Sequence, residues 1–238
     1  MSCNRMIKIL KSEERGKTKL AWLDGKHSFS FGRYVNRERQ NFGKLIVFND
    51  DIISPAKGFG AHPHENAEIV TIVLKGKVKH KDSVGNEGVI SEGETQRISA
   101  GKGVWHSEFN GSDSDDLHLL QIWLLPREED TEVSYEQKTY GDKLRENKLF
   151  KIVSGKKEKD MIYINQDADF HIGKFDEGKG EKFRIAKDKG VYFFVISGRV
   201  RLEKENLEKG DSAEIEDLKE IEFSFLEEGK VLIIETAM

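Results

Sequence analysis

The chain has 238 residues, 37% apolar and 34% charged, which allows one large domain or two smaller ones under a heavily charged surface. Its 39 basic and 43 acidic residues are interspersed and give a formal net charge of −4, so direct binding of nucleic acid is not indicated. No run approaches the roughly 18 apolar residues of a membrane span, and no signal-peptide pattern is present, so we expect a cytoplasmic protein. With Cys3 as the single cysteine, an intrachain disulfide and a thiolate metal site are excluded.

Strand patterns dominate the first half of the chain. Residues 29–35 alternate apolar and polar side chains, and 44–48 form a short apolar run. Residues 67–90 read as three strands separated by glycine-containing turns, and 117–126 are apolar enough for a buried strand. Many short strands joined by glycine turns predict an all-β fold of the sandwich or barrel type.

Two segments could hold short helices, one at 140–150 and a less convincing one at 218–221. The stretch 126–137 is polar and charged, so we expect a domain boundary there. These features leave the rest of the chain to strands and turns.

The two halves of the chain echo one another weakly. In each half a strand is followed by a glycine turn, a second strand, and then a turn with glycine and an acid. Gly76 would match Gly198, and 92–94 would match 209–211. Two copies of one β-barrel unit are the economical interpretation, and chance similarity between two β-meanders is the alternative.

Two short motifs predict a metal site. His62 and His64 are separated by one residue, and His106 and Glu108 repeat that spacing. Residues i and i+2 of a strand point to the same face, and Pro63 favours extended backbone at His62. On neighbouring strands the two pairs would converge. Three imidazoles and one carboxylate suit Fe(II), Mn, Ni, Cu or Zn. Either motif alone could be an ordinary loop or surface feature, but both together favour a site.

Other polar residues near these motifs have less certain roles. Glu68 could be a fifth ligand or could accept a hydrogen bond from a ligand histidine, and we favour such a supporting role or a structural one. Asn110 is expected to hydrogen-bond backbone at a strand end. We expect His80 to be solvated, His27 to be on the surface although it could reach the pocket, and His118 to be in the core or at a rim.

Four aromatic residues have positions that bear on the site. Trp105 and Trp123 are expected in the core rather than against a substrate. Phe29 and Phe31 share a parity and could line either the core or a pocket for an aromatic ligand.

The motif residues carry a resemblance to a known family. The run 58–110, beginning GFGAHPHEN and ending GVWHSEFN, resembles the metal-binding cupin domain of the pirin family. The segments WLDGKHSFSFGRY at 22–34, NDD at 49–51 and LHLLQIWLLP at 117–126 are similar to pirin segments as well. The resemblance extends from about Lys19 to Pro126, and it is a close resemblance to the bacterial pirin-like quercetin 2,3-dioxygenases.

This resemblance implies a bicupin, which is two tandem cupin (double-stranded β-helix or jelly-roll) β-barrels. Residues 1–128 would form the metal-binding domain and 129–238 a degenerate domain without metal. The ligand roles carry over to His62, His64, His106 and Glu108. The second cupin motif fits at Gly103, His106 and Asn110, but its usual proline is Gly101 here, and the leading glycine of the first motif is displaced.

The resemblance also implies an activity. Related proteins open flavonols such as quercetin with O2 and release carbon monoxide, using a divalent transition metal, with Fe(II) favoured and Mn, Ni, Cu or Zn possible. Glu108 would then be the catalytic base that takes the flavonol hydroxyl proton. The alternative is a non-enzymatic regulator that binds a protein partner, a transcription factor or a metabolic enzyme, through a structural or redox-sensing metal. A third possibility is an inactive metal-holding scaffold.

Overall fold

The computed structural model describes residues 6–141, 144 and 146–238. These residues form strands and one short 3-10 helix, η1 (Ser12–Glu14), and no helix among them is long and apolar enough to cross a membrane. The helix predicted at 140–150 falls partly outside the described residues, as does Cys3, and β13 begins at Lys148. The helix predicted at 218–221 is wrong, because a long strand begins at Glu220.

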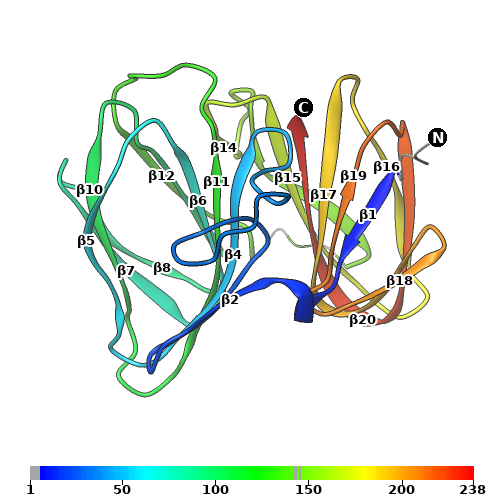
Figure 1. Ribbon diagram of the computed structural model, residues 1–238, viewed down its shortest axis with the longest axis horizontal. Helices are drawn as coiled ribbons and strands as arrows, with labels where there is room; N and C mark the ends of the chain where they lie inside the picture. The colour runs from blue at the N-terminus through cyan, green and yellow to red at the C-terminus, as the bar shows by residue number, and fades with distance from the viewer. Residues whose placement is uncertain (1–5, 142–143, 145) are drawn as a thin grey trace.

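Two sheets build the N-terminal half (Figure 1). The first has the order β12-β9-β6-β11-β4-β3-β2 and the second β5-β10-β7-β8. The strands of the first are β2 (Gly16–Lys19), β3 (Leu23–His27), β4 (Leu45–Ile53), β6 (Glu68–Lys75), β9 (Glu94–Ser99), β11 (Leu117–Leu124) and β12 (Ser134–Thr139). Those of the second are β5 (Gly58–His64), β7 (Lys77–Asp82), β8 (Glu87–Ser91) and β10 (Val104–Asn110).

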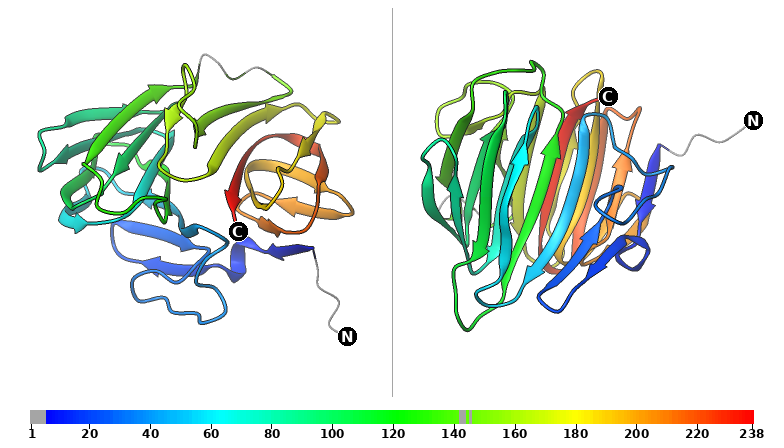
Figure 2. Two further views of the ribbon diagram at one scale, coloured as in Figure 1. Left: turned by 90° about the horizontal axis from the view of Figure 1, so that it is seen from above. Right: turned by 60° about the vertical axis from the view of Figure 1, so that its left-hand side comes forward.

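One nine-stranded sheet builds the C-terminal half and curves round its own core (Figure 2). Its strands are β1 (Ile7–Leu10), β13 (Lys148–Ser154), β14 (Ile162–Tyr163), β15 (Ala168–Phe175), β16 (Gly180–Arg184), β17 (Lys189–Leu202), β18 (Glu205–Glu208), β19 (Ser212–Ile215) and β20 (Glu220–Ala237). The all-β prediction is confirmed. The sheets are not closed into barrels, so the jelly-roll detail is not established.

Two strand pairings cross the predicted domain boundary. β1, from the start of the chain, pairs with β19, and β12 pairs with β9. Each predicted domain thus adds one strand to a sheet of the other, β1 to the C-terminal sheet and β12 to an N-terminal sheet. The division into 1–128 and 129–238 stays a prediction.

The period-two pattern of the strands divides the interior into separate cores. One face of β6 places Val70 and Ile72 in a core shared by the two halves, whose C-terminal side includes Tyr192 and Phe194. A second core fills the C-terminal half with side chains such as Phe193. In that half the ring of His171 lies 5.1 Å from that of Phe183; that the second half lacks a metal site stays a prediction.

The interior of the N-terminal half contains two apolar clusters rather than one. The first includes Ile53, Val73 and Leu119, and the second includes Ile69 and Ile98, with Trp123 packed against it. Polar inward-facing residues of the same strands lie between them in sequence, for example Thr71 between Ile69 and Val73. Thr71 of this polar layer contacts Glu108, one of the residues of the predicted metal site.

The backbone conformation of the glycine turns is the same in the two halves of the chain. Gly76 and Gly198 both have positive φ values, 83° and 80°, and Gly93 and Gly210 have 81° and 84°. In each half the later glycine donates its N–H to the carbonyl of the residue three before the earlier glycine, at 3.3 and 2.8 Å. These matching turns support the interpretation of two copies of one unit.

The strand predictions hold except at one place. The runs 44–48, 67–90 and 117–126 lie in strands as predicted. The strand predicted at 29–35 is wrong, because β3 ends at His27 and the chain continues as a loop in which Phe31 and Tyr34 form an isolated bridge around Gly32, whose φ is 56°. The alternating aromatic side chains of 29–35 pack against other rings, and the segment does not pair with a neighbouring strand among those that the structure describes.

Candidate metal centre

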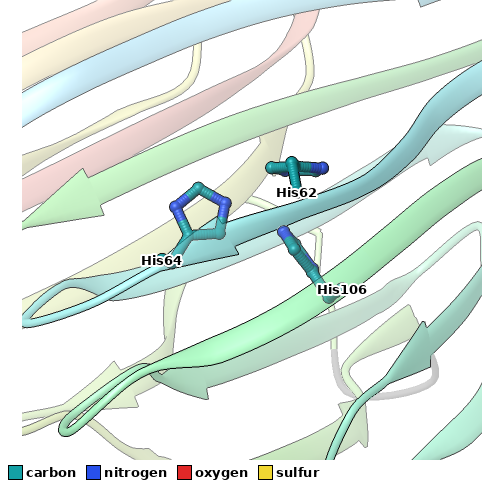
Figure 3. A group of neighbouring side chains, drawn as sticks. All are labelled: His62, His64 and His106. Atoms are coloured by element: carbon teal, nitrogen blue, oxygen red, sulfur yellow. The ribbon is translucent and has the colours of Figure 1, made fainter.

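The three motif histidines meet on two neighbouring strands (Figure 3). β5 and β10 are antiparallel, and His106 lies directly opposite His62. The ring centroids of His62 and His106 are 4.5 Å apart, and His64 lies 4.8 Å from each. Pro63 is tolerated because β5 is at the end of its sheet. The three side chains therefore lie together, as expected from their two-residue spacing on neighbouring strands.

Glu108 lies beside this trio but belongs to a second group. The register of β10 against β5 shifts between His106 and Glu108, so that Glu108 lies opposite Phe59. Ligand atoms of His62, His64 and His106 lie within 4.8 Å of one another, and so do those of His80, His106 and Glu108. The four-residue ligand set stays a prediction, and His106 is the residue that joins the two groups.

Two of the three histidines, His64 and His106, have lowered pKa values, which favours the neutral form that binds a metal. Burial, and then the neighbouring histidines, lower the pKa of His64 to about 4 and that of His106 to about 3. His62 places Nδ1 2.8 Å from the carbonyl of Gly60, so Nδ1–H donates and Nε2 is left for a ligand.

Unpartnered nitrogens support a metal at this place. Nε2 of His64 and both ring nitrogens of His106 are buried and have no hydrogen-bond partner among the described residues. Buried polar atoms are nearly always paired in folded proteins. Neutral imidazole nitrogens directed at one another beside a carboxylate fit a divalent transition metal ion.

Three side chains hold the Glu108 carboxylate in place. Oε2 accepts a hydrogen bond of 2.7 Å from Nε2 of Gln121, and Oε1 lies 3.3 Å from the donor Nε2 of Gln96 and 3.2 Å from Oγ1 of Thr71. The single hydroxyl proton of Thr71 can go to this oxygen or to Oε1 of Gln121, 3.1 Å away. These three residues come from β6, β9 and β11, and sequence reasoning missed them. For Thr71 and Gln121 the inward parity on predicted strands was the available signal, whereas Gln96 lies in a strand that was not predicted.

Two histidines are placed differently from the predictions. His80 was expected in solvent, but it is 1% exposed and stacks on Tyr135 at 5.2 Å. Its flanking lysines point outward from β7, and His80 points inward by the same alternation. His27 was expected on the surface, but it is buried and bonded to Thr18 and Asn49, and burial lowers its pKa.

Glu68 has a structural role on the far side of its strand. Its Oε2 accepts hydrogen bonds from Ser99 Oγ at 2.9 Å and from the backbone N–H of Asn165 at 3.0 Å. It therefore faces the C-terminal half, not the histidines, and it is neither a ligand nor a partner of one. Asn110 bonds the backbone carbonyls of Ile53 and Asp115, as expected at a strand end. His118 is half-buried and bonded to Asp50.

Aromatic side chains continue outward from the histidines in two directions. On one side Phe59 lies 6.4 Å from His62 and 5.3 Å from Trp22. On the other side Trp123 lies 4.7 Å from His64 and 5.6 Å from Phe31. All four are only partly buried. We call Trp22, Phe31, Phe59 and Trp123 the aromatic rim.

The remaining aromatic predictions have mixed outcomes. Trp105, expected in the core, is 55% exposed, because the alternation that turns His106 inward turns its neighbour outward. Phe29 and Phe31 lie in different surroundings. Phe29 is buried in the core shared by the two halves, and Phe31 is part of the aromatic rim.

Comparisons with known proteins identify the family of the chain. The profile of the Pirin family matches residues 10–124, and that of the quercetinase C-terminal cupin domain matches 151–236. A quercetin 2,3-dioxygenase of Escherichia coli K12 is 34% identical over 97% of this chain and 98% of its own. A putative quercetin 2,3-dioxygenase of Mycobacterium bovis is 37% identical, with coverages of 96% and 94%. A bacterial pirin from Escherichia coli in complex with nickel(II) is 33% identical and superposes with a TM-score of 0.92, over 97% of this chain and 99% of its own.

Proposed function

This chain belongs to the pirin family, and we propose that it is a metal-dependent dioxygenase that opens flavonols such as quercetin with O2 and releases carbon monoxide. The observation that carries the proposal is the cluster of His62, His64 and His106, which directs unpartnered imidazole nitrogens together beside a buried carboxylate and an aromatic rim. The names of the similar proteins support the same reaction class.

We propose His62, His64, His106 and Glu108 as the residues that hold the metal. Their two chemical types suit Fe(II), which we favour, and also Mn, Ni, Cu or Zn; the similar pirin bound nickel(II). When bound, such an ion acts as a Lewis acid and lowers the pKa of a coordinated flavonol hydroxyl.

The side chains of this chain would prepare the substrate for O2. Glu108 is the proposed base for the hydroxyl proton, and Gln121, Gln96 and Thr71 keep its carboxylate oriented. The aromatic rim offers flat apolar surfaces on both sides of the histidines, which suits planar rings. The natural substrate is then a flavonol-like aromatic that carries a metal-binding oxygen.

Reconstitution tests the proposal. Metal-free protein is loaded anaerobically with Fe(II), Mn, Ni, Cu or Zn in turn and mixed with quercetin and air, and the flavonol absorbance is followed. Metal-dependent loss of absorbance that disappears in His62→Ala and Glu108→Ala supports the dioxygenase. Bound metal without turnover for every ion contradicts it.

A second role, as a regulator that binds a protein partner, has one observation in its favour. Trp105 and Phe109 alternate with the proposed ligands on β10 and are 55% and 38% exposed on the opposite face. Partner binding that is lost in Trp105→Ser, with quercetin turnover absent in the wild type, would favour this role. The cytoplasmic location and the absence of direct nucleic-acid binding remain predictions.

A further inference from the structure

His80 is a buried imidazole that the proposed ligand set does not use. It lies directly opposite Glu108 where β7 pairs with β10, and its side chain is inaccessible to solvent. Neither ring nitrogen has a hydrogen-bond partner among the described residues. Nε2 has the Asp82 carboxylate 3.5 Å away. Because buried polar atoms are nearly always paired, the unpartnered Nδ1 indicates a partner that is not a protein group.

The neighbours of His80 are metal-ligating side chains. His80, His106 and Glu108 each present one ligand atom, and these three atoms lie within 4.8 Å of one another. All three residues are buried. This group lies on β7 and β10 and is fully buried. The group of His62, His64 and His106 includes the edge strand β5, and its members His62 and His64 are partly exposed.

Asp82 completes an arrangement that is common around metal-bound histidines. Such a histidine usually directs its second ring nitrogen to a carboxylate, which fixes the ring. Asp82 Oδ2 lies 3.5 Å from Nε2 of His80. The carboxylate is itself fixed by the backbone N–H groups of Val84 and Asn86, at 3.0 and 2.8 Å, and by the Asn86 side chain. This leaves Nδ1 of His80 for an ion.

We propose that His80, His106 and Glu108 form an inner position for a divalent transition metal ion, in addition to the outer position at His62, His64 and His106. Two imidazoles and a carboxylate suit Zn(II), Co(II) or Ni(II). The two positions share His106, and also Glu108 if the proposed four-residue ligand set holds the outer ion, so a single ion occupies one position or the other. The inner position is tested by measuring bound metal. The outcome therefore does not depend on whether the protein turns over flavonols.

Variants of the whole chain separate the two positions. Metal-free protein is titrated with Co(II). Both the amount of bound Co(II) and its visible absorption spectrum are measured. The outer position is removed in His62→Ala/His64→Ala, and both positions are removed when His80→Ala is added. We expect the double variant to retain one Co(II) per chain, with a spectrum different from that of His80→Ala alone, and the triple variant to retain none.

Equal Co(II) binding by the double and triple variants, whether none or one ion, would overturn the inner position. His118→Gln, at a half-buried histidine outside both groups, is the matched control and should bind as the wild type. A His62→Gln/His64→Gln variant answers the same question if the alanine variant is unfolded. In the double variant, Asp82→Asn should weaken Co(II) binding about 10- to 100-fold, as loss of a histidine's carboxylate partner does at metal sites; unchanged affinity would contradict the role of Asp82.

Discussion

Gln121 donates a 2.7 Å hydrogen bond from Nε2 to Oε2 of Glu108, and thereby connects β11 in one sheet with β10 in the other. It is the shortest of the three hydrogen bonds that hold this carboxylate. The position of the one proposed acidic ligand is therefore set from the facing sheet, not from its own strand.

Replacement of Gln121 by leucine should weaken metal binding by about 10- to 100-fold, the usual effect of removing a group that orients a ligand. The volume is nearly kept, so the fold should persist. Metal affinity is measured by titration of the metal-free protein. Gln40→Leu, in the exposed loop after β3, is the control, and equal affinities for the two variants would contradict the orienting role.

Glu108→Gln should lower the quercetin turnover number by about 10²- to 10⁴-fold at saturating metal, because a carboxamide cannot take the hydroxyl proton. The variant is compared with Glu94→Gln on the neighbouring β9, whose carboxylate bonds Ser91 and Gln137 away from the histidines. Turnover of the Glu108 variant within a few-fold of this control would exclude Glu108 as the base.

The histidines predict a specific pH dependence in the metal-free protein. His64 and His106 have pKa values of about 4 and 3, whereas an unfolded histidine has about 6.5. Between these values the unfolded chain binds more protons, so the free energy of unfolding falls as the pH falls below about 6.5. NMR titration of the ring protons should show no change for either residue from pH 7 to 5. Midpoints near 6.5 would contradict the burial argument.

Asp51 should produce the opposite slope. Burial, with Asp50 nearby, raises its pKa to about 8, and Oδ1 has no partner among the described residues. From about pH 4 to 8 the unfolded chain gives up this proton and the folded chain keeps it, so stability from this group is lost as the pH rises. Asp51→Asn does not titrate, and its stability relative to the wild type should therefore increase from pH 5 to pH 8 in urea unfolding. Asp24→Asn, at a half-exposed carboxylate paired with Lys19, serves as control, and a constant difference for Asp51→Asn would contradict the shifted pKa.

Strand alternation was sufficient to predict the histidine trio, because parity is a local property. His62, His64 and His106 needed only the two-residue spacing and two adjacent strands. The same rule, applied to β7, would have turned His80 inward, but the charged neighbours Lys79 and Lys81 suggested a solvated segment. Only the pairing of β7 with β10 shows that His80 faces Glu108.

Longer-range features of the site could not be predicted from local patterns. The register shift after His106 separates Glu108 from the pair on β5, and it depends on how β10 meets both of its neighbours. The support from Gln121 requires the facing sheet. Glu68 shows the same limit, because its four-residue spacing from His64 suggested the site, whereas β6 starts after a turn and directs it to the other half.

The most direct test of the central claim is carbon monoxide release and oxygen incorporation with 18O2. Metal-loaded wild type, consuming quercetin, should release one carbon monoxide per flavonol and place both labelled atoms in the products, and metal-free protein should do neither. Quercetin loss without carbon monoxide, or at the same rate without metal, would contradict a metal-dependent dioxygenase.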